Sequence, residues 1–122
     1  MNNDVELEPG FLKTLVSALE NDPRCAFASG KLLSAADHSR FDGAGDALLQ
    51  GGGAYHLGHD DFDAGQFDEE LPILAACGAA VLFRRSVLVE IDGFDEAFFA
   101  YLDDLDACLR AHLAGYTGLY VP

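Results

Sequence analysis

The 122-residue sequence contains no tryptophan, one methionine and few basic residues. Seven lysines and arginines stand against 21 aspartates and glutamates, which gives a formal net charge of -14 at pH 7. So negative a chain is repelled by nucleic acid and by anionic lipid, which argues against direct binding to either. No apolar run reaches the length of about 18 residues that a membrane-spanning helix needs, so the sequence predicts no such helix.

The sequence also has only three cysteines, Cys25, Cys77 and Cys108. Their number is odd, and no two of them have the CxxC spacing that is typical of zinc or redox sites. They are therefore predicted to be reduced and mostly buried thiols. Because disulfides are rare in reducing compartments, this pattern favours a cytoplasmic protein.

Several catalytic and binding motifs are missing. The sequence has no GxxxxGK[ST], no HExxH and no GxSxG. A dinucleotide-binding GxGxxG that starts at Gly43 fails, because Leu48 stands where the last glycine is needed. An EF-hand loop counted from Asp61 fails as well, since Gly65 stands at a ligand position and Gln66 at the glycine position.

Half of the residues are hydrophobic, which is sufficient for one domain with its own core over residues 1–122. Apolar periodicity and breaker residues predict an alternating series of elements. Helices are expected over 8–21, 84–91 and 101–114, and strands over 25–33, 73–83 and 118–122. Alternating helices and strands predict an α/β fold.

A long acidic, glycine-rich region spans residues 34–72, and no lysine or arginine lies between Arg40 and Arg84. It shows no clear period and is predicted to be a loop region, with room for short strands. Loops of this length in compact domains are usually functional or mobile. His56 and His59 lie here, and an exposed loop position is the favoured interpretation over an approach to substrate.

The segment FFAYLDDLDACLR, residues 98–110, holds three aspartates in an otherwise amphipathic helix. A rotation of 100° per residue places four leucines on the expected core face: Leu102, Leu105, Leu109 and Leu113. Asp103, Asp106 and Arg110 group on the opposite side, and the last two form an i,i+4 pair. Asp104 differs, because it lies at the border of the apolar face beside three small residues, Ala107, Cys108 and Ala111.

The simplest interpretation of these carboxylates is structural. Acidic residues in the first turn of a helix are stabilised by the helix dipole, by about 0.3–1 kcal/mol each. Spacing alone therefore favours structural charges over catalysis, although the border position of Asp104 is suitable for the floor of a cleft.

A family resemblance changes this balance. Residues 78–122 read GAAVLFRRSVLVEIDGFDEAFFAYLDDLDACLRAHLAGYTGLYVP. This stretch resembles the C-terminal half of family 2 glycosyltransferases, especially the rhamnosyltransferase-like members, with their RR-x-V-L, G-G-F-D-E-x-F-F-x-Y-x-E-D-x-D-L-x-x-R and terminal V-P patterns. The opening, NNDVELEPGFLKTLVSAL, resembles the segment that carries the family's metal-binding DxD-type motif. The resemblance therefore runs from Asn2 to Pro122.

The resemblance implies a partial GT-A domain, a mixed sheet with flanking helices, and inverting transfer of a sugar from a nucleotide-diphosphate donor. Asp4 matches the metal ligand for Mg²⁺ or Mn²⁺, and Asn2 and Asn3 complete that motif. Asp104 matches the general base, which would take the proton from the acceptor hydroxyl. Asp103 occupies the neighbouring Glu position, and Gly78 lies where the backbone approaches the sugar.

The family's N-terminal nucleotide-binding half has no counterpart here, so the isolated chain is expected to be inactive. Exposed apolar sheet surface would favour a homodimer. The resemblance also implies a glycan or lipid-linked acceptor, a role in polysaccharide biosynthesis, and room for peripheral membrane association of a full-length enzyme. The alternative is a non-catalytic acidic interaction module that retains the transferase fold.

Overall fold

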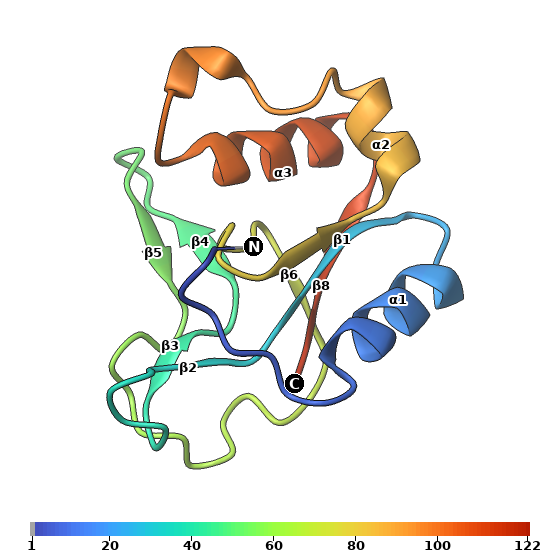
Figure 1. The fold of residues 1–122 in the computed structure, drawn as a ribbon. Helices are drawn as coiled ribbons and strands as arrows, with labels where there is room; N and C mark the ends of the chain where they lie inside the picture. Colours follow the sequence, from blue (N-terminus) through green and yellow to red (C-terminus); the bar gives the residue numbers. More distant parts are fainter. Residues whose placement is uncertain (1) are drawn as a thin grey trace.

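A computed structural model describes residues 2–122 of the chain (Figure 1). The helices are α1 (Phe11–Asn21), α2 (Arg85–Glu90) and α3 (Asp103–Leu113), with a 3-10 helix η1 (Glu96–Phe98). The strands are β1 (Cys25–Gly30), β2 (Leu32–Leu33), β3 (Phe41–Gly43), β4 (Asp46–Leu48), β5 (Ala54–His56), β6 (Leu71–Ile73), β7 (Val81–Phe83) and β8 (Thr117–Val121). This combination of helices and strands confirms the predicted α/β class.

The main sheet has four strands in the order β6-β8-β1-β7. It is mixed, because β8 runs parallel to β1 whereas β7 is antiparallel to β1 and β6 is antiparallel to β8. Two small sheets, β2-β3 and β4-β5, lie to one side of it (Figure 1). No helix described between residues 2 and 122 is long and apolar enough to cross a bilayer.

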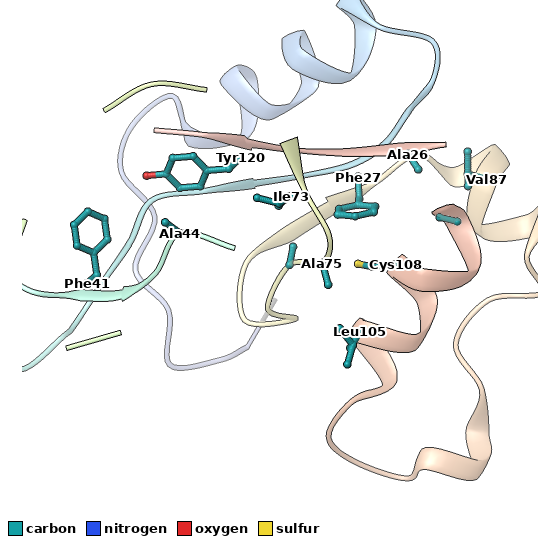
Figure 2. Close-up of a cluster of buried hydrophobic side chains, with 12 residues drawn as sticks. Ala26, Phe27, Phe41, Ala44, Ile73, Ala75, Val87, Leu105, Cys108 and Tyr120 are labelled. Carbon is teal, nitrogen blue, oxygen red and sulfur yellow. The ribbon is translucent and has the colours of Figure 1, made fainter. Parts of the chain in front are cut away.

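Helices α1 and α3 pack against the main sheet through two separate apolar clusters. Helix α1 buries Leu15, Ala18 and Leu19 in the smaller cluster, which also contains Cys25, Ala28 and Val121. Helix α3 contributes to the larger cluster, where Cys108 lies beside Phe27 and Ala75 (Figure 2). The flanking helices therefore stabilise the sheet through different residues of the same strand.

Strand β1 supplies side chains to both clusters, and its pairing with β8 is irregular. Ala26 and Phe27 are sequence neighbours, and both belong to the larger cluster. The register of β1 against β8 shifts between Cys25 and Phe27, and such a bulge places two consecutive side chains on one face. The tight packing continues at Gly118 on β8, where an added Cβ would meet the Phe27 ring at 2.1 Å.

The prediction of a single strand over 73–83 is wrong. Strand β6 ends at Ile73 and β7 begins at Val81, and a loop over 74–80 separates them. The backbone of this loop bonds to other parts of the chain: the N–H and carbonyl of Ala75 pair with those of Asp46, and the N–H of Gly78 donates to Asp104. These partners draw the small-residue segment away from the sheet and towards α3.

The acidic region 34–72 contains β3, β4 and β5 and the start of β6. It is held to the main sheet by Lys31, whose Nζ atom lies 3.0 Å from Asp63 Oδ2 and 2.6 Å from Asp68 Oδ1. Lys31 also interrupts the strand that was predicted over 25–33, which divides into β1 and β2. The region 34–72 thus forms short strands, although its sequence shows no hydrophobic periodicity.

Helix α3 begins later than predicted and turns a different face to the core. Tyr101 and Leu102 have positive φ angles of 68° and 66°, which excludes them from the helix. Leu102 is 47% exposed and Leu113 is 88% exposed, so two of the four predicted core leucines lie outside the core. The buried residues of α3 are Leu105, Ala107, Cys108 and Ala111. Small side chains allow the helix to approach the sheet closely, and Asp104 stands beside them as predicted.

Candidate active site

A cleft of about 910 Å³ lies among α3, the loop 74–80 and the β4-β5 hairpin. Besides two tyrosines, its wall includes six residues with polar or titratable side chains: Asn2, Asp46, His56, Cys77, Asp103 and Asp104. Aromatic side chains also line it: Tyr55, Phe83, Phe94, Phe99 and Tyr101. No lysine or arginine among residues 2–122 lines this cleft. The arrangement combines carboxylates with apolar surface, which is suitable for a polyhydroxylated molecule.

Asp104 lines this cleft, and two backbone hydrogen bonds hold its side chain. The N–H of Gly78 donates to Oδ2 at 2.6 Å, and the N–H of Leu105 donates to Oδ1 at 2.8 Å. The side chain is half-buried. Because each carboxylate oxygen has a second lone pair, both oxygens can still accept a proton or a hydrogen bond from a molecule in the cleft.

Gly78 makes the contact with Asp104 possible. A Cβ atom at this position would lie 3.1 Å from Oδ2 of Asp104, closer than most Cβ contacts, and 3.4 Å from its Cβ. The sequence predicted a close backbone approach at Gly78, with a sugar as the partner. The structure shows a close approach to the Asp104 carboxylate, and contact with a sugar stays a prediction.

The other two aspartates of α3 differ from each other. Asp106 Oδ2 accepts a hydrogen bond from Arg110 Nε at 2.7 Å, which confirms the predicted i,i+4 pair. Arg110 also donates to the carbonyl oxygens of Ile91 and Gly93, so the pair fixes the turn that follows α2. Asp103 was grouped with them on the outer side, but it is half-buried and lines the cleft.

The N-terminal segment reaches the same cleft through Asn2. The N–H of Asn2 donates to the carbonyl of Ala79 at 2.9 Å, which places Asn2 beside the loop 74–80. Asn3 and Asp4 are exposed and do not line the cleft. Within residues 2–122 no three His, Cys, Asp or Glu side chains are grouped to hold a metal ion. The described residues therefore form no complete metal site, and the ligand role of Asp4 stays a prediction.

The hairpin contributes a pair that sequence reasoning missed. Asp46 begins β4 and His56 ends β5, and the two are register partners across the hairpin. His56 Nδ1 lies 2.5 Å from Asp46 Oδ1. The glycine-rich segment 50–53 was the sequence signal for this pair. Such a segment between two short strands predicts a hairpin, and a hairpin places residues of the two strands opposite each other. His59 lies outside the cleft and contacts the carbonyl of Asp42.

Burial and nearby negative charge shape the electrostatics of the cleft. Burial raises the pKa of the Asp46 carboxyl, the interaction with His56 opposes this rise, and the charges of Asp104 and Asp42 add to it. Burial also raises the pKa of the Cys77 thiol, as do the neighbouring charges of Asp46 and Asp104. The cleft therefore attracts protons and hydroxyl donors and repels unaccompanied anions.

Comparisons with known proteins identify related sequences. Residues 1–122 match the family model described as "Glycosyltransferase like family 2". In Mycobacterium tuberculosis, strains CDC 1551 / Oshkosh and ATCC 25618 / H37Rv, a protein named N-acetylglucosaminyl-diphospho-decaprenol L-rhamnosyltransferase is 33% identical over 132 residues. That alignment covers 99% of this chain and 43% of the relative.

A shorter match is found in Escherichia coli (strain K12). Its rhamnosyltransferase WbbL is 47% identical over 45 residues, which cover 37% of this chain and 17% of that protein. No solved structure gives a significant match. The chain thus spans less than half the length of each curated relative named here.

Proposed function

The chain belongs to glycosyltransferase family 2, its fold is a partial GT-A domain, and we propose that it forms the acceptor-side part of an inverting sugar transferase. The donor in this proposal is a nucleotide-diphospho-sugar, and the acceptor is a glycan or a lipid-linked saccharide. The names of the relatives support L-rhamnose as the sugar and an N-acetylglucosaminyl-diphospho-lipid as the acceptor. Such a reaction belongs to cytoplasmic steps of polysaccharide biosynthesis.

The observation that carries the proposal is the position of Asp104. Its carboxylate is fixed by Gly78 and Leu105 in the wall of the cleft, and it matches the aspartate of the family's E-D pair. In the proposed step, an acceptor hydroxyl oxygen attacks the anomeric carbon while Asp104 takes the hydroxyl proton. The bond from that carbon to the diphosphate oxygen breaks, and the nucleotide diphosphate leaves from the opposite face.

Asp103 has a supporting place in this proposal. It lines the cleft next to Asp104, and at the first residue of α3 it has the shorter side chain at the family's Glu position. Mg²⁺ or Mn²⁺ at Asp4 remains part of the prediction from the family motif. Asp4 alone is an insufficient donor set, so the proposed proton transfer uses only the residues of the cleft.

The test is a chimera in which residues 1–122 replace the matching part of the mycobacterial relative. Transfer of labelled sugar from the nucleotide donor to a lipid-linked acceptor is the expected result, with the isolated 122-residue chain inactive as its control. A folded chimera without transfer would contradict the proposal. It would favour the alternative, a non-catalytic interaction module, for which the exposed rings of Phe99 and Tyr101 and the net charge of -14 are the supporting observations.

A further inference from the structure

The pair formed by Asp46 and His56 lies in the cleft wall, and its two members are not equally accessible. The Asp46 side chain is 8% exposed, whereas the His56 side chain is 39% exposed. A molecule in the cleft therefore meets the imidazole and not the carboxylate behind it. The hairpin register holds the two together, because Asp46 and His56 are directly opposite each other on β4 and β5.

The contact between Asp46 and His56 also determines which nitrogen of the His56 imidazole carries the proton. An ionised carboxylate is only an acceptor, so the 2.5 Å contact requires His56 Nδ1 to donate to Asp46 Oδ1. In the neutral ring, Nε2 then carries a lone pair and acts as an acceptor. Within residues 2–122, Nε2 of His56 has no hydrogen-bond partner. In this tautomer His56 therefore offers an accessible acceptor nitrogen in the wall of the cleft that Asp104 also lines.

The rest of the wall indicates what this acceptor binds. Three carboxylates and no lysine or arginine among residues 2–122 line the cleft, which disfavours a phosphate group without an accompanying cation against this wall. Hydroxyl groups donate readily to carboxylates and to an imidazole nitrogen. The aromatic side chains of the wall, such as Phe83 and Phe94, offer flat apolar surface for the C–H face of a ring. A neutral pyranose fulfils both conditions.

We propose that His56 is a specificity-determining residue that accepts a hydrogen bond from a sugar hydroxyl through Nε2, with Asp46 as its positioning residue. This inference rests on the proposed transferase function and adds a contact that the family motifs do not contain. The shared chemistry is a neutral pyranose, which belongs to the acceptor or to the donor.

The test uses the 122-residue chain labelled with ¹⁵N and titrated with the methyl glycosides of a hexose, a deoxyhexose and an N-acetylhexosamine. Comparing the three glycosides identifies which sugar the cleft prefers, and so whether it is the acceptor or the donor sugar. The expected result is a shift of His56 Nε2 on binding, together with shifts of the Gly78 and Leu105 amides at Asp104.

Two matched variants separate binding from folding. His56→Asn keeps a donor towards Asp46 but has no atom at the place of Nε2, and it is expected to weaken glycoside binding by about three- to tenfold. His56→Gln places an amide oxygen near that position and is expected to bind within about twofold of the unchanged chain. Asp46→Asn is expected to leave the fold intact and to change the ring ¹⁵N shifts of His56.

The outcomes distinguish this inference from the proposed function. Glycoside shifts at Gly78 and Leu105, with His56 Nε2 unmoved and His56→Asn binding normally, would overturn the role of His56 while leaving sugar binding at Asp104 in place. The absence of shifts at all three sites would also overturn the inference. The proposed function is judged separately, by transfer in the chimera.

Discussion

Gly78 and Asp104 are 26 residues apart in the sequence and are joined by a hydrogen bond of 2.6 Å from the Gly78 N–H to Oδ2 of Asp104. The bond connects the loop 74–80 to the first turn of α3, and both elements line the cleft. It restricts the rotation of the carboxylate and leaves further lone pairs on both oxygens. Orientation of this kind is what a general base requires.

Replacing Asp104 with asparagine is expected to remove the base while preserving its shape. The amide oxygen can still accept the Gly78 hydrogen bond, but an amide cannot take a proton at neutral pH. In the chimera we expect kcat to fall by about 10²- to 10⁴-fold with little change in acceptor KM. Steady-state kinetics with labelled donor would measure both constants.

Asp106→Asn is the matched control, since Asp106 lies one turn along the same helix and pairs with Arg110. It is expected to lower the free energy of unfolding by about 0.3–1 kcal/mol and to leave kcat within a factor of about three. Normal turnover in Asp104→Asn would contradict the assignment. If, in addition, His56→Gln lost kcat, the general base would be assigned to His56 on the β4-β5 hairpin.

Adding a methyl group at Gly78 is expected to displace Asp104. The new Cβ would lie 3.1 Å from Oδ2, so the carboxylate or the loop must shift by a few tenths of an ångström. We expect Gly78→Ala to reduce kcat of the chimera by about tenfold and to cost about 1–3 kcal/mol in stability. Kinetics and urea unfolding would measure the two effects.

Gly51→Ala is the control for this change, because Gly51 lies in the hairpin turn with nothing within 4 Å of an added Cβ. Its kcat and unfolding free energy should match those of the unchanged protein. If Gly78→Ala behaved in the same way as Gly51→Ala, the Gly78 contact would have no part in orienting Asp104.

The sequence was sufficient to predict the fold class and the position of Asp104. The presence of both helices and strands follows from periodicity, and the family motif and the small neighbours of Asp104 both indicated a cleft. The prediction of the buried helix face was wrong at Leu102 and Leu113. A helical-wheel projection assigns the most apolar side chains to the core and takes no account of their size. In the structure α3 packs through alanines and Cys108, and this choice depends on how closely a helix can approach the sheet.

Contacts between distant segments could not be predicted from the sequence. The loop 74–80 has the composition of a buried strand, and only its hydrogen bonds to Asp46 and Asp104 explain why it leaves the sheet. The pair of Asp46 and His56 depends on the register of β4 and β5, and a shift of one residue would separate the two side chains.

The three thiols are expected to react with maleimide in a fixed order. Cys25 is 1% exposed and Cys108 is 0% exposed, and burial raises the pKa of Cys108 to about 12. Cys77 is half-buried in the cleft wall and should be the site that labels in the folded chain. Its raised pKa keeps the thiolate fraction low, so labelling should be slow and should accelerate with pH.

Mass spectrometry of peptides after labelling in buffer and in urea would measure this order. In Cys77→Ser, labelling of the folded chain should disappear, while both buried thiols should still react in urea. Labelling of Cys108 in buffer before Cys77 would contradict the packing of α3 against the sheet.

The unfolding free energy is expected to depend on the ionisation of Asp46. Burial, as the largest cause, raises the pKa of Asp46 above its ordinary value of 3.8, so the folded state holds this proton more tightly than the unfolded state. Stability from this group is therefore present at low pH and is lost as pH rises from about 3.8 through the raised folded pKa. Asp46→Asn does not titrate and should lack this loss.

Urea unfolding at a series of pH values would measure the effect as the difference between the unchanged chain and Asp46→Asn. The difference is needed because Asp63 acts in the opposite sense: its hydrogen bond with Lys31 lowers its pKa, so its stabilisation is lost as pH falls. Relative to the variant, the unchanged chain should become less stable as pH rises above about 3.8. A difference that stayed constant would show that the contact with His56 balances the burial of the Asp46 charge, and a change in the other direction would show that it outweighs this burial.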